Sequence, residues 1–577
     1  MRRTRRTLLL ATTAALCLAL TAGLALAGSR DPGGAAAGGT TAAGAPLLDT
    51  APVVVGPADP AAVVEVGLAL RGQDPDGLRA ALAAFSDPTS PGHGQLVTPA
   101  AFGDRFGLPA ADEDQLVATL TAAGLAVSGR VPQRTSLRVS GTVADVERVL
   151  GVTLQQLTDP HTGAAYIASM TPPVVPFALA GSVAGIIGLD PRLPVSALDL
   201  ADAPAPPSRG LTPRDLATAY GFSSLWDAGI TGDGQSVAIL QFGKDTDEDL
   251  AVFDGAFGIQ GPAPERITIG DGVAAAPADF ATEATLDTQV VRAAAPGAQI
   301  LVYGFENSTS MAQAVDTIVA EGRTKIISLS YGKCYLPNEF ILPAEVEQGF
   351  QSFAAAALAG VTLYAAAGDW GAFTCHVFEP TEHRETTFWP SCADNVVGVG
   401  GTFLETRADG SYLRETGWEH YLTTSGTGGG LSPSDQMPAW QAGPGVLNDK
   451  SNGHRQCPDV SAVADPDSGY LIYVTDQSNG QGSWQMVGGT SAATPLWAGI
   501  QALMQQAAAQ QGVDSLGFLA PRYYRIFQNE PDAFHDVTRG GNLVDESGPG
   551  WDYATGVGSP DVEVLTQALL RDIAANP

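Results

Sequence analysis

The 577-residue sequence predicts two folded units: an α+β domain, then a larger α/β domain built on a doubly wound parallel sheet. Short strands and helices are mixed between residues 46 and 198, whereas strand and helix alternate regularly from 211 to 577. That alternation is typical of a parallel sheet covered by helices on both faces. Apolar residues make up 45% of the chain and charged residues only 16%, so a large core can form.

The first 45 residues carry a targeting pattern rather than part of a fold. Four arginines precede an apolar run over 8–27 that ends in Ala25-Leu26-Ala27. This predicts a signal peptide, residues 1–27, used by the Sec or the twin-arginine pathway, and hence a secreted protein. An uncleaved anchor is the alternative. Residues 28–45 are mostly Gly, Ala, Thr and Ser and predict a flexible linker. We expect no membrane association once the signal is removed, because no other stretch is long and apolar enough.

The α+β unit, residues 46–198, is predicted from short periodic segments. Its expected strands are 63–68, 136–139 and 152–157, and its expected helices are 76–85, 113–123 and 143–150. A polar, proline-rich stretch follows at 199–210. Because such stretches are exposed, we expect an interdomain linker that contains a proteolytic processing site.

The α/β unit, residues 211–577, is predicted from alternating segments. Its expected strands are 236–242, 299–304, 324–330, 361–366 and 396–399, and its expected helices are 282–295, 311–321, 345–358 and 492–511. Helices that follow strands in this way place chemistry-bearing loops at the carboxyl ends of the strands.

The charge balance excludes one class of function. Acidic residues outnumber basic ones 61 to 30, for a net charge of −31. Binding of nucleic acid by phosphate neutralisation is therefore not expected. Self-repulsion is smallest near the isoelectric point of about 4.4, which fits a protein that works in acid. A merely acidic secreted protein is the alternative.

The cysteines indicate disulfides. Cys17 leaves with the signal, and the four that remain allow three connectivities. We expect Cys334–Cys375 and Cys392–Cys457, because Cys334 and Cys375 each follow the end of a strand and adjacent parallel strands can bring those ends together. The absence of any CxxC spacing argues against zinc.

Ser491 is the first candidate catalytic residue. It lies in the glycine-flanked segment 488–495, at the expected start of an apolar helix, where backbone N–H groups can meet developing negative charge. An ordinary N-cap serine is the alternative. A serine nucleophile needs a base, and no histidine lies in a context that indicates a serine–histidine–aspartate triad.

Three acidic residues offer a different base and donor. Glu283 and Asp287 are four residues apart and share one face of the expected helix. When two carboxylates lie this close together, their repulsion raises the pKa of one of them, so the pair can act as a base in acid. A solvated acidic first turn is the alternative. Asp369 follows a strand and is flanked by Gly368 and Gly371, at the edge of a parallel sheet where sites gather, or it is simply a turn residue.

Taken together, and in their order along the chain, these patterns resemble those of the sedolisin family of serine-carboxyl peptidases, whose members include kumamolisin-like proenzymes. The matches are Gly489 to Pro495, the pair Glu283 and Asp287, Gly368-Asp369, Ser328 to Gly332, Gly428 to Gly430, Pro458 to Ser461, and two prodomain segments at 86–88 and 96–99. Together they cover about residues 50–570. Tyr331 stands where the family usually has tryptophan, and the loops around Cys334 and 375–390 also depart from it, which leaves substrate preference open.

The resemblance implies a fold and a set of roles. The fold would be a subtilisin-like catalytic domain preceded by a ferredoxin-like prodomain. Ser491 would be the nucleophile, Glu283 the general base and then acid, Asp287 the residue that orients Glu283, and Asp369 a protonated donor in the oxyanion hole. Substrate would bind along Ser330, Tyr331, Gly332, Gly428, Gly429 and Gly430.

The resemblance also implies one structural Ca²⁺ ion. Its ligands would be the carboxylates of Asp536 and Asp552 and the carbonyls of Val537, Gly548 and Gly550. Carboxylates and carbonyls in glycine-rich loops supply the oxygen ligands that Ca²⁺ prefers.

The expected function is that of a secreted, acid-acting serine-carboxyl endopeptidase, a monomer made as a self-processing proenzyme. Its partners would be peptide or protein substrates and its own propeptide, as an intramolecular inhibitor and chaperone. A tripeptidyl-peptidase of the same family and an inactive calcium-binding homologue are the alternatives. A serine esterase is disfavoured, since no Gly-x-Ser-x-Gly motif is present.

Overall fold

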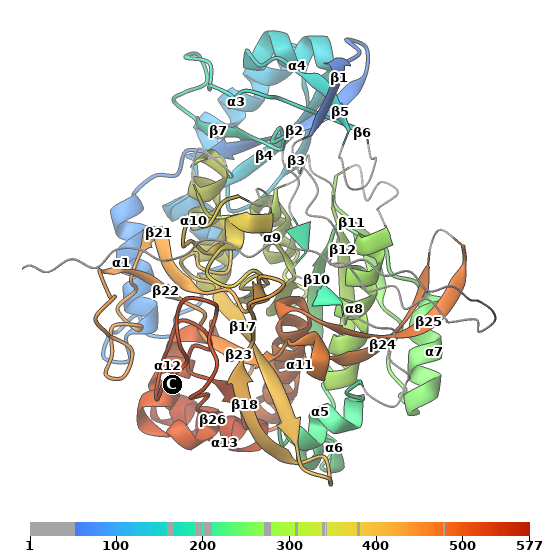
Figure 1. Ribbon diagram of the computed structural model, residues 1–577. Coiled ribbons are helices and arrows are strands. Elements are labelled where there is room, and N and C mark those ends of the chain that lie inside the picture. The colour runs from blue at the N-terminus through green and yellow to red at the C-terminus, as the bar shows by residue number, and fades with distance from the viewer. Residues whose placement is uncertain are drawn as a thin grey trace, which may run out of the picture. The chain divides into compact units, whose positions relative to one another are not determined.

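Figure 1 shows the computed structural model, in which two folded units follow one another along the chain. The structure describes residues 52–158, 165–191, 195–196, 199–200, 210–270, 278–305, 310–336, 341, 343–377, 381–476 and 479–576. The expected signal peptide, the linker 28–45 and most of the linker 199–210 lie outside these residues. Among the described helices, none is long and apolar enough to cross a membrane.

The prodomain is an antiparallel sheet with helices. Its strand order is β3-β4-β2-β7, from β2 (Val63–Leu70), β3 (Ala126–Arg130), β4 (Ser136–Thr142) and β7 (Val183–Ile187). A smaller sheet joins β1 (Val53–Pro57), β5 (Gln155–Thr158) and β6 (Ala165–Ala168). The helices are α1 (Pro75–Ser86), α2 (Pro99–Arg105), α3 (Ala110–Ala122) and α4 (Val143–Leu150). The apolar faces of β2, β4 and α4 meet in one core.

The catalytic unit is built on a sheet of strand order β11-β12-β10-β13-β15-β17-β18, with β23 also paired to β17. Its strands are β10 (Ser236–Gln241), β11 (Glu265–Thr268), β12 (Gln299–Gly304), β13 (Ile326–Leu329), β15 (Thr362–Ala366), β17 (Val397–Thr406), β18 (Tyr412–Gly417) and β23 (Val460–Val463). All pair in parallel except β17 with β18. The expected parallel sheet is confirmed.

Alternate residues of the central strand β10 enter two different cores, which is why helices cover both faces of the sheet. Val237 and Ile239 pack with α8 (Ala278–Ala294) and α11 (Thr490–Ala509). Ala238 and Leu240 pack with α9 (Met311–Glu321) and α10 (Pro343–Leu358). The helices α8 and α11 come very close at Gly499, where a Cβ would lie 2.6 Å from that of Ala294.

The remaining helices and strands complete the catalytic unit. The helices are α5 (Pro213–Ala219), α6 (Ser223–Asp227), α7 (Asp247–Phe257), α12 (Ala520–Asn529) and α13 (Val562–Ala575). The strands include β14 (Tyr331–Cys334), β16 (Phe388–Trp389), β21 (Gly430–Gln436), β22 (His454–Cys457), β24 (Tyr470–Asp476) and β25 (Gln481–Gly488). The sequence did not predict the hairpin β24–β25 or the helices α2, α7, α12 and α13.

Buried polar contacts join the prodomain to α9 and α10. The carboxylate of Asp316, on α9, accepts hydrogen bonds from the hydroxyls of Thr135 (2.7 Å) and Ser136 (2.9 Å). Nearby, the ammonium of Lys333 lies 3.1 Å from Asp190 and 3.0 Å from Glu345. Buried charges are retained only when they are paired in this way, so the prodomain supplies part of the polar surroundings of the catalytic unit.

Candidate active site

Ser491 lies in the first turn of α11, immediately after a glycine in a backbone conformation that side chains rarely adopt. Gly489, with φ of 95°, is the N-cap residue, so the alternative in which Ser491 caps the helix is wrong. Ser491 is fully buried, and its hydroxyl donates to the carbonyl of Ser330 at 3.2 Å. The hydroxyl therefore lies in the first turn of the helix, against the segment that carries Ser330.

Glu283 and Asp287 lie on α8, and both are completely buried. The alternative of a solvated acidic turn is therefore wrong. Oδ1 of Asp287 accepts a hydrogen bond of 2.6 Å from the hydroxyl of Ser330. Burial raises the pKa of Asp287 well above its usual range, against the Ser330 hydrogen bond, which lowers it, and Asp245 adds like-charge repulsion. The site thus favours a protonated carboxyl at this position.

The segment that joins β13 to β14 connects this carboxylate pair to Ser491. Besides the bond of its hydroxyl to Asp287, Ser330 accepts a hydrogen bond from the Ser491 hydroxyl at its backbone carbonyl, and its hydroxyl oxygen lies 3.3 Å from the Ser491 carbonyl oxygen. Next to it, the ring of Tyr331 is packed between Phe242 (5.4 Å between centroids) and Phe280 (5.7 Å). Burial raises the pKa of the Tyr331 phenol, and the nearby charges of Glu283 and Asp287 raise it further. The serine and the carboxylates predicted from separate motifs therefore share one site.

Asp369 follows β15, as expected, and faces the start of α11. Asp369 is only 3% exposed, which does not fit an ordinary surface turn. Oδ1 of Asp369 accepts from both the backbone N–H and the hydroxyl of Thr490, each at 2.8 Å. Because Thr490 precedes Ser491, these bonds bring Asp369 close to Ser491. The sequence motif contained Thr490, but its pattern gave no hint of this contact.

The segment Gly428–Gly430 packs against the backbone of the turn after β15, which carries Asp369. The N–H of Gly428 donates to the carbonyl of Gly368 at 2.7 Å. A Cβ at Gly428 would lie 1.9 Å from the carbonyl oxygen of Ala367, and one at Gly429 1.8 Å from that of Tyr553. Only glycine allows these close approaches, so the triple glycine brings one backbone against the turn that carries Asp369.

The end of the prodomain and the start of the linker each form a short strand beside the site. In antiparallel pairing, β8 (Val195–Ser196) aligns with Tyr331 and Gly332, and β9 (Asp199–Leu200) aligns with Val487 and Gly488. Gly488 is three residues before Ser491. The chain that leaves the prodomain is thus paired with two of the predicted substrate-binding residues and, a few residues later, with the strand that leads to Ser491.

The five residues expected to hold calcium come together in one loop cluster. The N–H of Gly550 donates to both carboxylate oxygens of Asp536 (3.1 and 3.2 Å), and the N–H of Gly548 donates to Oδ2 of Asp552 (3.1 Å). Burial raises the pKa of Asp536, and it raises that of Asp552 to about 6. Asp536 is exposed and Asp552 is buried, and the carboxylates and backbone carbonyls of these glycine-rich loops offer an all-oxygen donor set, which fits a hard divalent cation.

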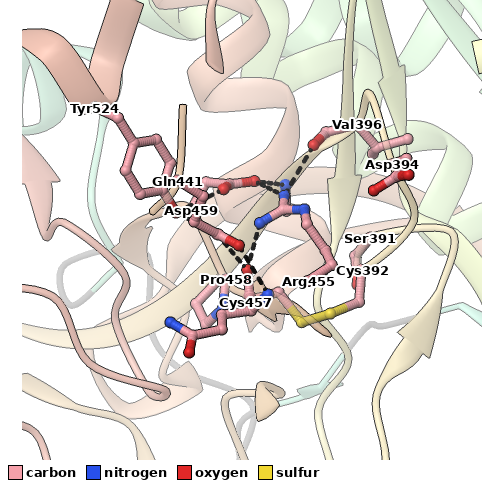
Figure 2. Close-up of polar contacts among 12 residues, drawn as sticks. Ser391, Cys392, Asp394, Val396, Gln441, Arg455, Cys457, Pro458, Asp459 and Tyr524 are labelled. Atoms are coloured by element: carbon pink, nitrogen blue, oxygen red, sulfur yellow. Dashed lines mark hydrogen bonds and ion pairs between the residues drawn. A yellow bond between two sulfur atoms is a disulfide. The ribbon is translucent and has the colours of Figure 1, made fainter. Parts of the chain in front are cut away.

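Both expected disulfides, Cys334–Cys375 and Cys392–Cys457, are present in the structure. Cys457 precedes the Pro458–Ser461 motif, which is part of a buried network of hydrogen bonds (Figure 2). Asp459 accepts from the guanidinium of Arg455, from the N–H of Gly398 (2.8 Å) and from the Tyr524 hydroxyl (2.9 Å). Asp459 therefore links β22, which carries Arg455, to Gly398 on β17 and to Tyr524 on α12.

Comparison with known proteins identifies both units. The pro-kumamolisin activation domain matches residues 51–192, and the subtilase family matches residues 272–521. Kumamolisin from Bacillus sp. is 32% identical over 461 residues, which cover 75% of this chain and 78% of kumamolisin. Sedolisin from Pseudomonas sp. is 30% identical over 548 residues, which cover 90% of this chain and 88% of sedolisin.

A solved structure extends this similarity to the fold. The structure of Pseudomonas sedolisin, a serine-carboxyl proteinase complexed with two molecules of pseudo-iodotyrostatin, aligns with a TM-score of 0.56 and 30% identity. The alignment covers 64% of this chain and 99% of that one. The chain belongs to the sedolisin family: it is a serine-carboxyl peptidase in which a pro-kumamolisin activation domain precedes a subtilase-like catalytic domain.

Proposed function

We propose that the protein is a secreted, acid-acting endopeptidase that processes itself from a proenzyme. Ser491 attacks the carbonyl carbon of a peptide bond while Glu283 takes its proton. Glu283 then gives that proton to the leaving amine, which leaves an acyl-enzyme on Ser491. Water, deprotonated by Glu283, releases the acid and restores the serine. The common contact of Ser330 with Asp287 and Ser491 supports this pairing of nucleophile and carboxylates.

Asp287 and Asp369 complete the proposed machinery. Asp287 orients Glu283 and shares its proton, which fits the raised pKa of this buried carboxyl. The protonated carboxyl of Asp369 donates an O–H hydrogen bond to the tetrahedral oxyanion, which an ionised carboxylate cannot do. Both roles need acid, because each requires a carboxyl group that keeps a proton.

We favour an endopeptidase over a tripeptidyl-peptidase because of how β8 and β9 pair with the strands beside the site. An internal segment of the chain aligns with Tyr331 and Gly332 on one side and with Val487 and Gly488 on the other. A cleft that accepts a continuous chain on both sides of the reacting bond suits an endopeptidase. We therefore expect the first self-cleavage between Ser196 and Asp199, slightly before the predicted linker at 199–210, with later trimming inside that linker.

Two experiments test this function. Purified proenzyme is brought to about pH 4, and the new N-termini are sequenced over time, with Ser491→Ala as the matched inactive protein. Wild type should be cut first between residues 196 and 199, and the variant should remain intact. Matured enzyme is then given pairs of peptides with free and acetylated N-termini. An endopeptidase cuts both, whereas cutting of the free peptides alone, three residues at a time, would replace our proposal with the tripeptidyl-peptidase.

We also propose one structural Ca²⁺ ion in the loop cluster around Asp536 and Asp552. These carboxylates and the carbonyls of Val537, Gly548 and Gly550 would hold it. The ion, when bound, supplies positive charge that offsets the buried carboxylate of Asp552 and the neighbouring one of Asp536. Its proposed role is structural, since it would tie the loop after β26 (Phe534–His535) to the loop before β27 (Ser559–Pro560).

A further inference from the structure

The residue before the nucleophile, Thr490, makes a set of hydrogen bonds that the proposed function does not yet use. Its hydroxyl accepts from the N–H of Gly368 at 3.0 Å and lies 2.8 Å from Oδ1 of Asp369. Its backbone N–H donates to the same Oδ1 at 2.8 Å. Thr490 is fully buried, and Asp369 nearly so. All of these groups are therefore shielded from water that could otherwise replace one partner.

The direction of these bonds follows from the number of protons available. The N–H of Gly368 can only donate, so it occupies a lone pair of the Thr490 hydroxyl. The single hydroxyl proton is then directed to Oδ1 of Asp369. With the backbone N–H as well, Oδ1 receives two donors. In a neutral carboxylic acid, the oxygen that accepts is the carbonyl oxygen, and the other carries the proton.

We propose that Thr490 is a positioning residue for the reaction: it makes Oδ1 of Asp369 the accepting oxygen, and so holds the acidic proton on Oδ2 for the oxyanion. This inference rests on the proposed function, in which Asp369 is the oxyanion donor. Donors fixed in advance need no reorganisation as charge develops, which is the main source of oxyanion stabilisation.

The backbone around Thr490 is built to maintain this arrangement. Gly368 has φ of 97°, a conformation that favours glycine, and this turn presents its N–H to the Thr490 hydroxyl. The carbonyl of Gly368 is held by the N–H of Gly428. The Thr490 methyl group packs close to Gly401, where a Cβ would lie 3.4 Å from it, so the rotamer of Thr490 is also restricted by packing.

Thr490→Val is the variant that tests the proposal, because it keeps the shape and removes the hydroxyl. Since the Asp369 donor that Thr490 positions acts on charge that develops only in the transition state, kcat should fall by about 10- to 100-fold with KM little changed. Thr490→Ser keeps the hydroxyl and should restore most of kcat. The control is Thr494→Val, which removes another fully buried hydroxyl of the same helix turn, one that donates to the Thr490 carbonyl and not to Asp369.

The pH profile separates this role from a general loss of structure. A hydrogen bond donated to a carboxylate favours its ionised form. Without the Thr490 hydroxyl, Asp369 should keep its proton to higher pH, so the alkaline limb of kcat for Thr490→Val should move to higher pH than in wild type. The limb of Thr494→Val should not move. Melting temperatures of all variants are measured in parallel, and propeptides are removed by a tagged wild-type enzyme that is then withdrawn.

A double-mutant cycle with Asp369→Ala decides between failure of this inference and failure of the proposed function. If Thr490 acts through Asp369, Thr490→Val should cost less than threefold in the Asp369→Ala background. An equal cost in both backgrounds, or a pH profile that matches that of Thr494→Val, would overturn the role of Thr490. A small effect of Asp369→Ala by itself would instead overturn the oxyanion role of Asp369 and the function built on it.

Discussion

The hydroxyl of Ser330 donates a 2.6 Å hydrogen bond to Oδ1 of Asp287, and both residues are completely buried. Burial raises the pKa of Asp287, whereas this bond lowers it. A carboxyl whose pKa is raised on folding stabilises the fold in acid, and that stabilisation is lost as the pH rises through the folded pKa. Ser330 limits the loss, because it stabilises the ionised form.

Ser330→Ala should therefore destabilise the protein more at high pH than at low pH. We expect about 0.5–1.5 kcal/mol at pH 3, where Asp287 is neutral, and about 1.5–3 kcal/mol once Asp287 ionises. Unfolding is followed in the Ser491→Ala background, which prevents self-digestion. Ser328→Ala is the matched control, since Ser328 is equally buried on β13. A loss that does not depend on pH would show that Ser330 does not stabilise the ionised carboxylate.

The proposed carboxyl chemistry predicts an acid optimum. With matured enzyme, activity should peak in acid and fall towards neutrality, because Asp369 loses the proton that it donates and its charge then repels the oxyanion. Glu283→Gln should be nearly inactive at every pH. Asp369→Asn should lose about 10²–10³ in rate, and its residual activity should fall less steeply as the pH rises. An optimum above pH 7, abolished by a histidine-modifying reagent, would point instead to a serine–histidine enzyme.

The sequence predicted the architecture best where periodicity was strong. The expected bounds 143–150, 299–304 and 311–321 coincide with α4, β12 and α9, each of which has one clear apolar face or a fully apolar run. The helix α12 was missed although its buried residues Ala520, Tyr523 and Tyr524 have helical spacing, because tyrosines rather than aliphatic residues form most of that face. The hairpin β24–β25 was missed because β25 begins with exposed polar residues.

For the site, residue types could be predicted but contacts could not. Glu283, Asp287, Asp369 and Ser491 were found from motifs. In the structure, Ser330 contacts Asp287 and Ser491, Thr490 contacts Asp369, and Glu283 lies one helical turn from Asp287 on α8. The contact of Thr490 with Asp369 joins segments 121 residues apart. It depends on the backbone conformation of Gly368, which no local pattern reports. Likewise, the Pro458–Ser461 motif indicated the family, but only the structure shows that Asp459 is a structural anchor.

Asp459 should therefore matter for stability. Asp459→Asn would leave Arg455 as a buried cation without its counter-charge, since both side chains are completely buried. Loss of one partner of such a pair costs about 3–5 kcal/mol, so the melting temperature of the Ser491→Ala protein should fall by many degrees. Asp467→Asn, at an exposed position, should change the unfolding free energy by less than about 0.5 kcal/mol. Equal melting temperatures would contradict the structural role.

Removal of calcium should also lower stability. A ligand that binds only the folded state stabilises it by mass action, so excess chelator should reduce the melting temperature of the matured enzyme. Asp552→Ala should reproduce that reduction and should make the protein insensitive to chelator. Asp532→Ala, an exposed acidic position nearby, should behave as wild type. An unchanged melting temperature after verified metal removal would argue against the site.

His93 should act as a pH-sensitive contact in the release of the propeptide. His93, Arg522 and Arg525 line one pocket between the prodomain and the catalytic unit. Burial lowers the pKa of His93, and the charges of Arg525 and Arg522 lower it further. Both arginines are also paired with Asp572, and Asp87 faces His93 from the prodomain side. Docking therefore favours the neutral imidazole.

The sign of the effect follows from that lowered pKa. The contribution of His93 to docking is present above the ordinary histidine pKa of about 6.5 and is lost as the pH falls through that value and towards the docked pKa. With Ser491→Ala proenzyme nicked in the linker by an added protease, His93→Gln should shift propeptide release to lower pH in size-exclusion experiments. His383→Gln, an exposed histidine of the catalytic unit, should leave the midpoint unchanged. Asp316 gives the opposite contribution, since burial beneath the prodomain raises its pKa to about 6 and its protonated form favours docking. The comparison of single variants isolates each group: identical midpoints for His93→Gln and wild type would remove His93 from the release step.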